Sequence, residues 1–129
     1  MTPVDQTTFG PGRGNCLAAC IASLLDLPRA EDVPELVDPR DDPSGRSWRL
    51  QIEDWLRERG LGLVSIDALD VPPVIVHPTD LHYMAWGRSA RAHARHSVIY
   101  RDGRMVHDPH PDRTGLVNVD EFAFLVRLT

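Results

Sequence analysis

The sequence predicts an α+β fold, with helices in the first half of the chain and strands in the second. Two stretches, residues 16–25 and 47–59, carry apolar residues at helical spacing. After Gly60 the pattern changes to short extended segments bounded by Pro, Asp or Gly. Because the helices precede the strands instead of alternating with them, we expect a helical layer packed on a C-terminal antiparallel sheet.

The first helix is expected to begin at Cys16, directly after the Gly-rich stretch 10–14. Asn15 stands in the N-cap position, where a short polar side chain is favoured. The apolar stripe of this helix consists of Leu17, Cys20, Ile21, Leu24 and Leu25. Pro28 marks its end.

A Pro- and Asp-rich segment, residues 31–45, follows and is too polar for a core, so it is predicted to be a surface loop. The second helix is expected over residues 47–59, with Gly60 as its C-terminal stop. One face of this helix carries Trp48, Ile52, Trp55 and Leu56, and both Trp residues are expected in the core.

Five extended segments are predicted after the second helix. They cover residues 63–66, 74–77, 82–86, 95–100 and 104–107. The tail, residues 117–128, fits either a short helix from Asp120 or a final strand.

Length and composition limit the function classes. The 129 residues suit one domain, residues 1–129, and a net charge of −5 argues against a general binder of nucleic acid or anionic membranes. No apolar run approaches the roughly 18–20 residues of a membrane span, and the polar start lacks a secretory signal. We therefore expect a soluble, cytoplasmic protein. All 14 basic residues are Arg, which excludes a lysine nucleophile.

Cys16 and Cys20 differ in their expected environments. Cys16 opens a helix, where free N–H groups and the positive end of the helix dipole favour a nucleophilic thiolate. Cys20 lies on the apolar stripe one turn later and is expected to be a small buried residue. An inert core position is the alternative for Cys16.

The hairpin around Asp102 and Gly103 supplies a base, His96, and a carboxylate that orients it, Asp108. A two-residue loop would put His96 and Asp108 on opposite faces of the sheet. A three-residue loop at 101–103 pairs apolar residues better and puts His96 directly opposite Asp108, with Cβ atoms about 4.5–5.5 Å apart. We prefer the three-residue loop, which creates a Cys–His–Asp arrangement.

The segments GNCLAACIASLL and HSVIYRDGRMVHDP, in that order, resemble the papain-like cysteine protease superfamily. They are similar in particular to the small bacterial leader-peptidase domains of bacteriocin exporters. The resemblance implies that Cys16 is the nucleophile, His96 the general base and acid, and Asp108 the orienting residue. It also implies an oxyanion hole formed by the Cys16 backbone N–H and the side chain of Gln6, ten residues upstream.

Other residues have two readings each. Trp86 and His110 are expected to contact the substrate, although a loop His is more often simply exposed. The pairs His93/His96 and His107/His110 suggest a metal site only weakly, because they lie on a strand start or a Pro-broken loop and not on a helix that would direct both imidazoles to one point. Five Arg residues crowd one segment and form either a basic rim or an ordinary solvated face: Arg88, Arg91, Arg95, Arg101 and Arg104.

The sequence thus predicts a cysteine hydrolase that cleaves an amide, isopeptide or ester bond through an acyl-enzyme, without a cofactor or metal. A peptide or a small amide is the expected substrate. Two alternatives remain open, an acyltransferase of the same fold and a catalytically inactive papain-like binding module.

Overall fold

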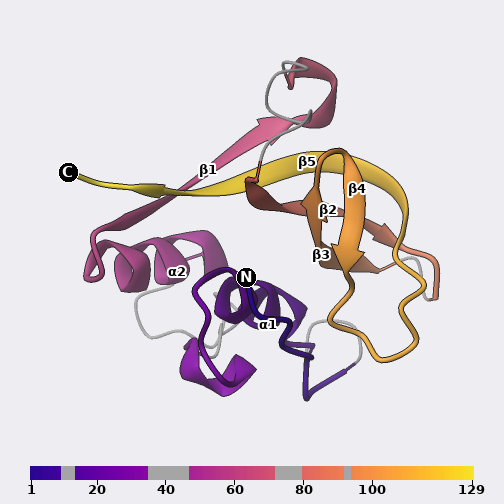
Figure 1. Cartoon of the computed structure of the whole chain (residues 1–129), viewed down its shortest axis with the longest axis horizontal. Helices are drawn as coiled ribbons and strands as arrows, with labels where there is room; N and C mark the ends of the chain where they lie inside the picture. Colours follow the sequence, from indigo (N-terminus) through magenta and orange to yellow (C-terminus); the bar gives the residue numbers. More distant parts are fainter. Residues whose placement is uncertain (10–13, 35–46, 72–79, 92–93) are drawn as a thin grey trace.

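The computed structural model describes residues 1–9, 14–34, 47–71, 80–91 and 94–129. Two α-helices and one 3₁₀ turn precede the first strand. A second 3₁₀ turn follows that strand and comes before the other four strands (Figure 1). The helices and turns are α1 (Cys16–Leu24), η1 (Ala30–Asp32), α2 (Trp48–Arg57) and η2 (Ala68–Asp70). The strands are β1 (Leu61–Asp67), β2 (His82–Ser89), β3 (Arg95–Arg101), β4 (Arg104–His107) and β5 (Leu116–Arg127). The predicted α+β class is confirmed.

Helix α1 lies within one residue of its predicted bounds and is the centre of the core. It packs against β2 and β3. Its residues from Ala18 to Ser23 are buried, because the small side chains of Ala18, Ala19 and Ala22 let the helix approach the sheet closely. Asn15 is the N-cap residue as predicted, but its side chain makes no capping hydrogen bond.

Helix α2 is two residues shorter at its end than predicted and packs against β1. The Ser47 hydroxyl accepts the Leu50 N–H, which closes the first turn. Ile52 and Leu56 are fully buried, as expected. Trp48, however, is 39% exposed, so its prediction as a core residue was wrong. It lies in the first turn and only the edge of its ring contacts Trp86.

The strands form one antiparallel sheet in the order β1-β5-β2-β3-β4. The tail is therefore a strand and not a helix, and β5 lies between β1 and β2 (Figure 1). The two helices lie on the same side of this sheet in Figure 1, and the core cluster joins them to Met84, Ile99 and Ala123 of the sheet. The predicted strand 74–77 lies outside the described residues.

The register predicted for the hairpin of β3 and β4 was wrong. Arg101 pairs with Arg104, so the loop has two residues, Asp102 and Gly103. Both have positive φ angles, 52° and 75°, which is the backbone of a two-residue hairpin turn and is tolerated by Asp and Gly. Tyr100 pairs with Met105, and the register then shifts so that Ile99 pairs with His107. This bulge sets the direction in which the chain leaves β4.

Of the predicted surface loop 31–45, residues 35–45 lie outside the described residues, and the described part is not entirely at the surface. Its first residues belong to η1, and Val33 is buried beside Ala30 and α1. Because the acidic residues Glu31 and Asp32 stand between Ala30 and Val33, the sequence pattern does not predict that these two apolar residues are buried. Among the described residues, no helix is long and apolar enough to cross a membrane.

Candidate active site

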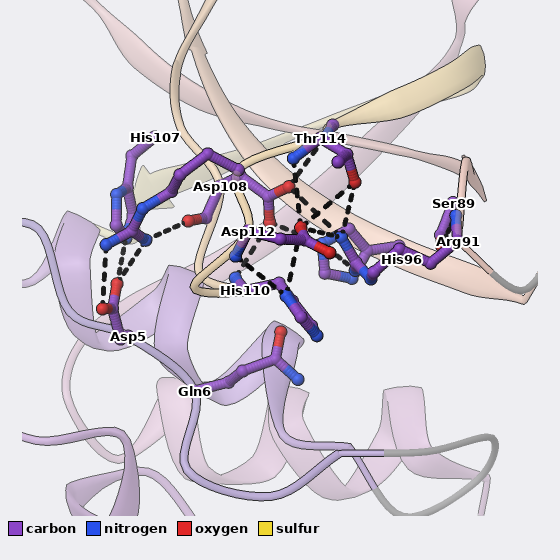
Figure 2. Close-up of polar contacts among 12 residues, drawn as sticks. Asp5, Gln6, Ser89, Arg91, His96, His107, Asp108, His110, Asp112 and Thr114 are labelled. Carbon is purple, nitrogen blue, oxygen red and sulfur yellow. Dashed lines mark hydrogen bonds and ion pairs between the residues drawn. The ribbon is translucent and has the colours of Figure 1, made fainter.

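His96 and Asp108 form a buried pair at the sheet end of the site (Figure 2). His96 is the second residue of β3, and Asp108 follows β4 directly. Nε2 of His96 lies 2.7 Å from Oδ1 of Asp108. Because an ionised carboxylate only accepts hydrogen bonds, Nε2 carries the proton and donates it to Asp108. Nδ1 is then the ring nitrogen that is left for a second partner.

The Asp108 carboxylate is held by backbone groups as well as by the imidazole. Oδ1 accepts the His110 N–H at 2.9 Å, and Oδ2 accepts the Gly115 N–H at 2.8 Å. The side chain is 1% exposed. Burial opposes its charge, but the hydrogen bonds from His96 and from these two N–H groups lower the pKa of Asp108 to about 2. The site therefore contains a fixed, ionised carboxylate.

His96 is held between this carboxylate and the Cys16 thiol. Burial on its own lowers the pKa of the imidazole, but hydrogen bonds with Asp108 and Cys16, together with their charges, raise the pKa of His96 to about 9. Cys16 reaches the imidazole from the first position of α1, and its side chain is partly buried. Of the three residues that the sequence named, His96 and Asp108 are in direct contact, and Cys16 lies near enough to the imidazole to raise the pKa of His96.

Cys20 is separated from this group, as the helical periodicity predicted. It is fully buried in the core. Burial raises the pKa of the Cys20 thiol well above its usual value, although the nearby Ser97 hydroxyl opposes the change. A thiol with these properties stays protonated and unreactive.

The segment that carries Gln6 is attached to the start of α1 by hydrogen bonds of Asn15. The Asn15 N–H donates to the Thr8 carbonyl, and Oδ1 of Asn15 accepts the N–H groups of Thr7 and Thr8. Thr7 and Thr8 therefore lie beside Asn15, the residue before Cys16. The Gln6 N–H also donates to the Pro109 carbonyl, which ties this segment to the residue after Asp108.

The Gln6 side chain is 7% exposed and points toward the His110 ring in Figure 2. Its Nε2 donates one hydrogen to the Thr8 carbonyl at 2.9 Å. Its Oε1 has no hydrogen-bond partner among the residues that the structure describes. The second hydrogen on Nε2 is available to a ligand.

The two predicted substrate contacts have different environments. Trp86 is 6% exposed and belongs to the core cluster. His110 is partly exposed, and its ring meets the edge of the Phe9 ring at 5.1 Å. Direct contact of either residue with a substrate stays a prediction.

The alternation of side chains along the strand predicts that His107 points away from Asp108 and pairs with Ser97, but it does not pair with Ser97. Because of the bulge it faces the N-terminal segment, where its Nε2 donates to the Val4 carbonyl at 2.9 Å. It borders a cavity of about 640 Å³ whose lining includes Asp108 and Arg113 but neither His96 nor Cys16. Within the described ranges, no group of three or more His, Cys, Asp or Glu side chains is arranged to hold a metal ion.

The crowded Arg residues are largely neutralised by carboxylates in space. Arg95 pairs with Asp120, Arg101 with Asp80 and Arg91 with Asp112. Sequence reasoning missed that Arg91 also contacts His96, because no local pattern distinguishes it from its neighbours.

Comparisons of the chain with protein-family models, with curated proteins and with solved structures found no match. A function for this chain therefore depends on the positions of Cys16, His96 and Asp108.

Proposed function

We propose that the protein is a papain-like cysteine hydrolase that cleaves an amide, isopeptide or ester bond through an acyl-enzyme. One observation carries this proposal: His96 lies 2.7 Å from the buried Asp108 carboxylate, and the Cys16 thiol at the start of α1 is near enough to help raise the pKa of the imidazole. A nucleophile, a base and a group that orients the base are the parts that acyl transfer to a thiol requires. The order of these parts along the chain agrees with the family that the sequence resembles.

The charge state of the site supports a reactive thiol. With a pKa of about 9, His96 is an imidazolium at neutral pH. A cation in contact with Cys16, together with the free N–H groups at the start of α1, favours the thiolate form of the nucleophile. Asp108 keeps the ring oriented and stabilises its positive charge.

In the first half-reaction the Cys16 thiolate attacks the substrate carbonyl, and a C–S bond forms as the carbonyl π electrons move to oxygen. The Cys16 N–H and the second hydrogen on Gln6 Nε2 are the donors proposed for this oxyanion. His96 then protonates the leaving amine or alcohol as the C–N or C–O bond breaks. An acyl-thioester on Cys16 is left.

In the second half-reaction neutral His96 takes a proton from water as the water oxygen attacks the thioester. The carboxylic acid leaves, and the proton returns the thiolate–imidazolium pair. An amine in place of water would give acyl transfer with the same residues in the same roles. We take water as the acceptor, which makes the overall reaction a hydrolysis.

An electrophilic peptide probe tests the proposal most directly. We expect intact-mass spectrometry to show one probe added to the wild type, none to Cys16→Ala, and unchanged labelling of Cys20→Ala, which is the matched control. Alkylation by iodoacetamide at pH 6 should be at least tenfold faster for Cys16 than for a free peptide thiol, and His96→Ala should remove this advantage.

The opposite result is equally clear. If Cys16 reacts at pH 6 no faster than a peptide thiol, and His96→Ala leaves that rate unchanged, the chain is not a thiol hydrolase. The catalytically inactive binding module then becomes the better reading.

A further inference from the structure

Arg91 lies against the His96–Asp108 pair. It belongs to the turn after β2, and its guanidinium reaches back toward the start of β3 (Figure 2). Nη2 lies 3.3 Å from Nε2 of His96, and Nη1 lies 3.7 Å from Oδ2 of Asp108. Arg91 therefore stands at the Nε2 end of the imidazole, beside the bond from His96 to Asp108.

Two residues of the segment after β4 hold this guanidinium in place. Nη1 of Arg91 donates to Oδ1 of Asp112 at 2.7 Å and to Oγ1 of Thr114 at 2.9 Å. Burial opposes ionisation of Asp112, but hydrogen bonds from Thr114 and the nearby charges of Arg91 and His110 lower its pKa. The anchor is thus an ionised carboxylate, which fixes the position of the cation.

The contact between Arg91 and His96 joins two donors. Nε2 of His96 carries a proton that it gives to Asp108, and a guanidinium nitrogen has only protons to offer. Nη2 therefore makes no hydrogen bond to the ring. Its effect is electrostatic, since a fixed positive charge at this distance disfavours the imidazolium and favours the Asp108 carboxylate.

We propose that Arg91 is a positioning residue that holds a fixed positive charge at the Nε2 end of His96 and so limits how tightly the imidazole keeps its proton. This inference depends on the proposed function, in which His96 must release that proton to the leaving group. Among the described residues, the titratable or charged groups that interact with His96 or with its partners Asp108 and Arg91 include Cys16 and Cys20 from α1, and His110, Asp112 and Arg113 after β4.

The balance of these charges explains why such a residue is useful. Asp108 and the Cys16 thiolate both stabilise the imidazolium, and a proton held too tightly is a poor general acid near neutral pH. Arg91 opposes them without occupying Nδ1. It also covers the Asp108 carboxylate, which keeps Oδ1 directed at the ring.

The test is a titration of His96 by NMR of its ring nitrogens in the whole chain. Arg91→Gln should raise the pKa of His96 by about 0.5–1 pH unit, because a repelling charge is removed. Arg91→Lys should restore most of the wild-type value. Arg95→Gln is the matched control, since Arg95 precedes His96 directly but pairs with Asp120, and it should leave the titration unchanged.

An unchanged titration in Arg91→Gln, or an equal shift in Arg95→Gln, would overturn the proposal. If Arg91→Gln does not fold, Thr114→Val decides, because it removes one tether of the guanidinium without changing any charge. A smaller upward shift in Thr114→Val supports the role of Arg91, and no shift contradicts it. This readout needs no turnover, so failure of the proposed function would be seen separately, as an unreactive Cys16.

Discussion

The Asp108 carboxylate lies 2.7 Å from Nε2 of His96, although these residues are not partners in the ladder of β3 and β4. The ladder ends where His107 pairs with Ile99, one step after the bulge. Asp108 then reaches the imidazole from the loop that follows, where the N–H groups of His110 and Gly115 hold its oxygens. The contact between base and orienting residue thus depends on a loop and not on strand pairing.

Asp108→Asn should lower the pKa of His96 from about 9 toward its ordinary value, because the charge that stabilises the imidazolium is removed. We expect alkylation of Cys16 by iodoacetamide at pH 6 to slow by about tenfold or more. Rate measurement by intact mass checks this. Asp112→Asn, which keeps Asp108 intact, should change the rate much less.

The pair should also give the protein a pH-dependent stability. The pKa of His96 in the folded state, about 9, exceeds its unfolded value of about 6.5, so its contribution is complete below about pH 6.5 and is lost as the pH rises through 9. The pKa of folded Asp108, about 2, lies below its unfolded value of about 3.9, so its contribution is present above about pH 3.9 and is lost as the pH falls through 2.

Asp108→Ala should therefore cost most between about pH 4 and 6.5, where we expect a loss of about 3 kcal/mol in the free energy of unfolding. The loss should become smaller toward pH 9–10. Urea denaturation across this range measures it. Asp120→Ala removes an exposed partner of Arg95 and should cost less than about 1 kcal/mol throughout, and a loss for Asp108→Ala that is constant with pH would contradict the assignment.

Gly87→Ala should damage the sheet next to the site. Gly87 pairs with His96 in the ladder of β2 and β3, and a Cβ atom there would lie 1.9 Å from the Asn118 carbonyl oxygen of β5. The backbone of β2 or β5 has to move, which we expect to cost about 3 kcal/mol or more in urea denaturation. Gly62→Ala is the control, because its nearest contact would be the flexible Leu128 side chain at 3.3 Å. Equal stabilities of the two variants would contradict this prediction.

Asn15→Ala should release the N-terminal segment from the start of α1. The Asn15 side chain accepts the N–H groups of Thr7 and Thr8 and donates to the Thr7 hydroxyl at 2.9 Å. Loss of these bonds should lower the free energy of unfolding by about 1–3 kcal/mol and reduce probe labelling of Cys16, because Gln6 is no longer fixed. Asn118→Ala, which removes an exposed hydrogen bond to Asp120, is the matched control for thermal unfolding and labelling. If Asn15→Ala leaves the labelling rate unchanged, the position of Gln6 does not contribute to the reaction of Cys16 with the probe.

The helices and the class of fold follow from periodicity, since the stripe of α1 and the Ser47 cap of α2 are local signals. The position of Asp108 does not follow from such signals. The hairpin has the two-residue loop, which was not the loop preferred from the sequence. A bulge, for which no residue type gives a signal, then shifts the register. His96 and Asp108 are in contact as predicted, but Asp108 reaches His96 from the loop after β4 and not through strand pairing.

Residues that act through long-range contacts were also beyond reach of the sequence. Arg91 differs from the surrounding Arg residues only in what lies across from it in space, Asp112 and Asp108. Gln6, in contrast, is named by the family resemblance, but no local pattern predicts the hydrogen bond from its N–H to the Pro109 carbonyl, which joins it to the residue after Asp108. Both relationships depend on segments far apart in the chain.

The place of β5 between β1 and β2 has a consequence for synthesis of the protein. Strand β1 pairs only with β5 among the described strands, so on the ribosome it has no partner until residues 116–127 have emerged. Until then the exposed edges of β1 and β2 are open to incorrect pairing with other chains. Translation speed over the last strand should therefore influence how much of the nascent protein reaches its native state.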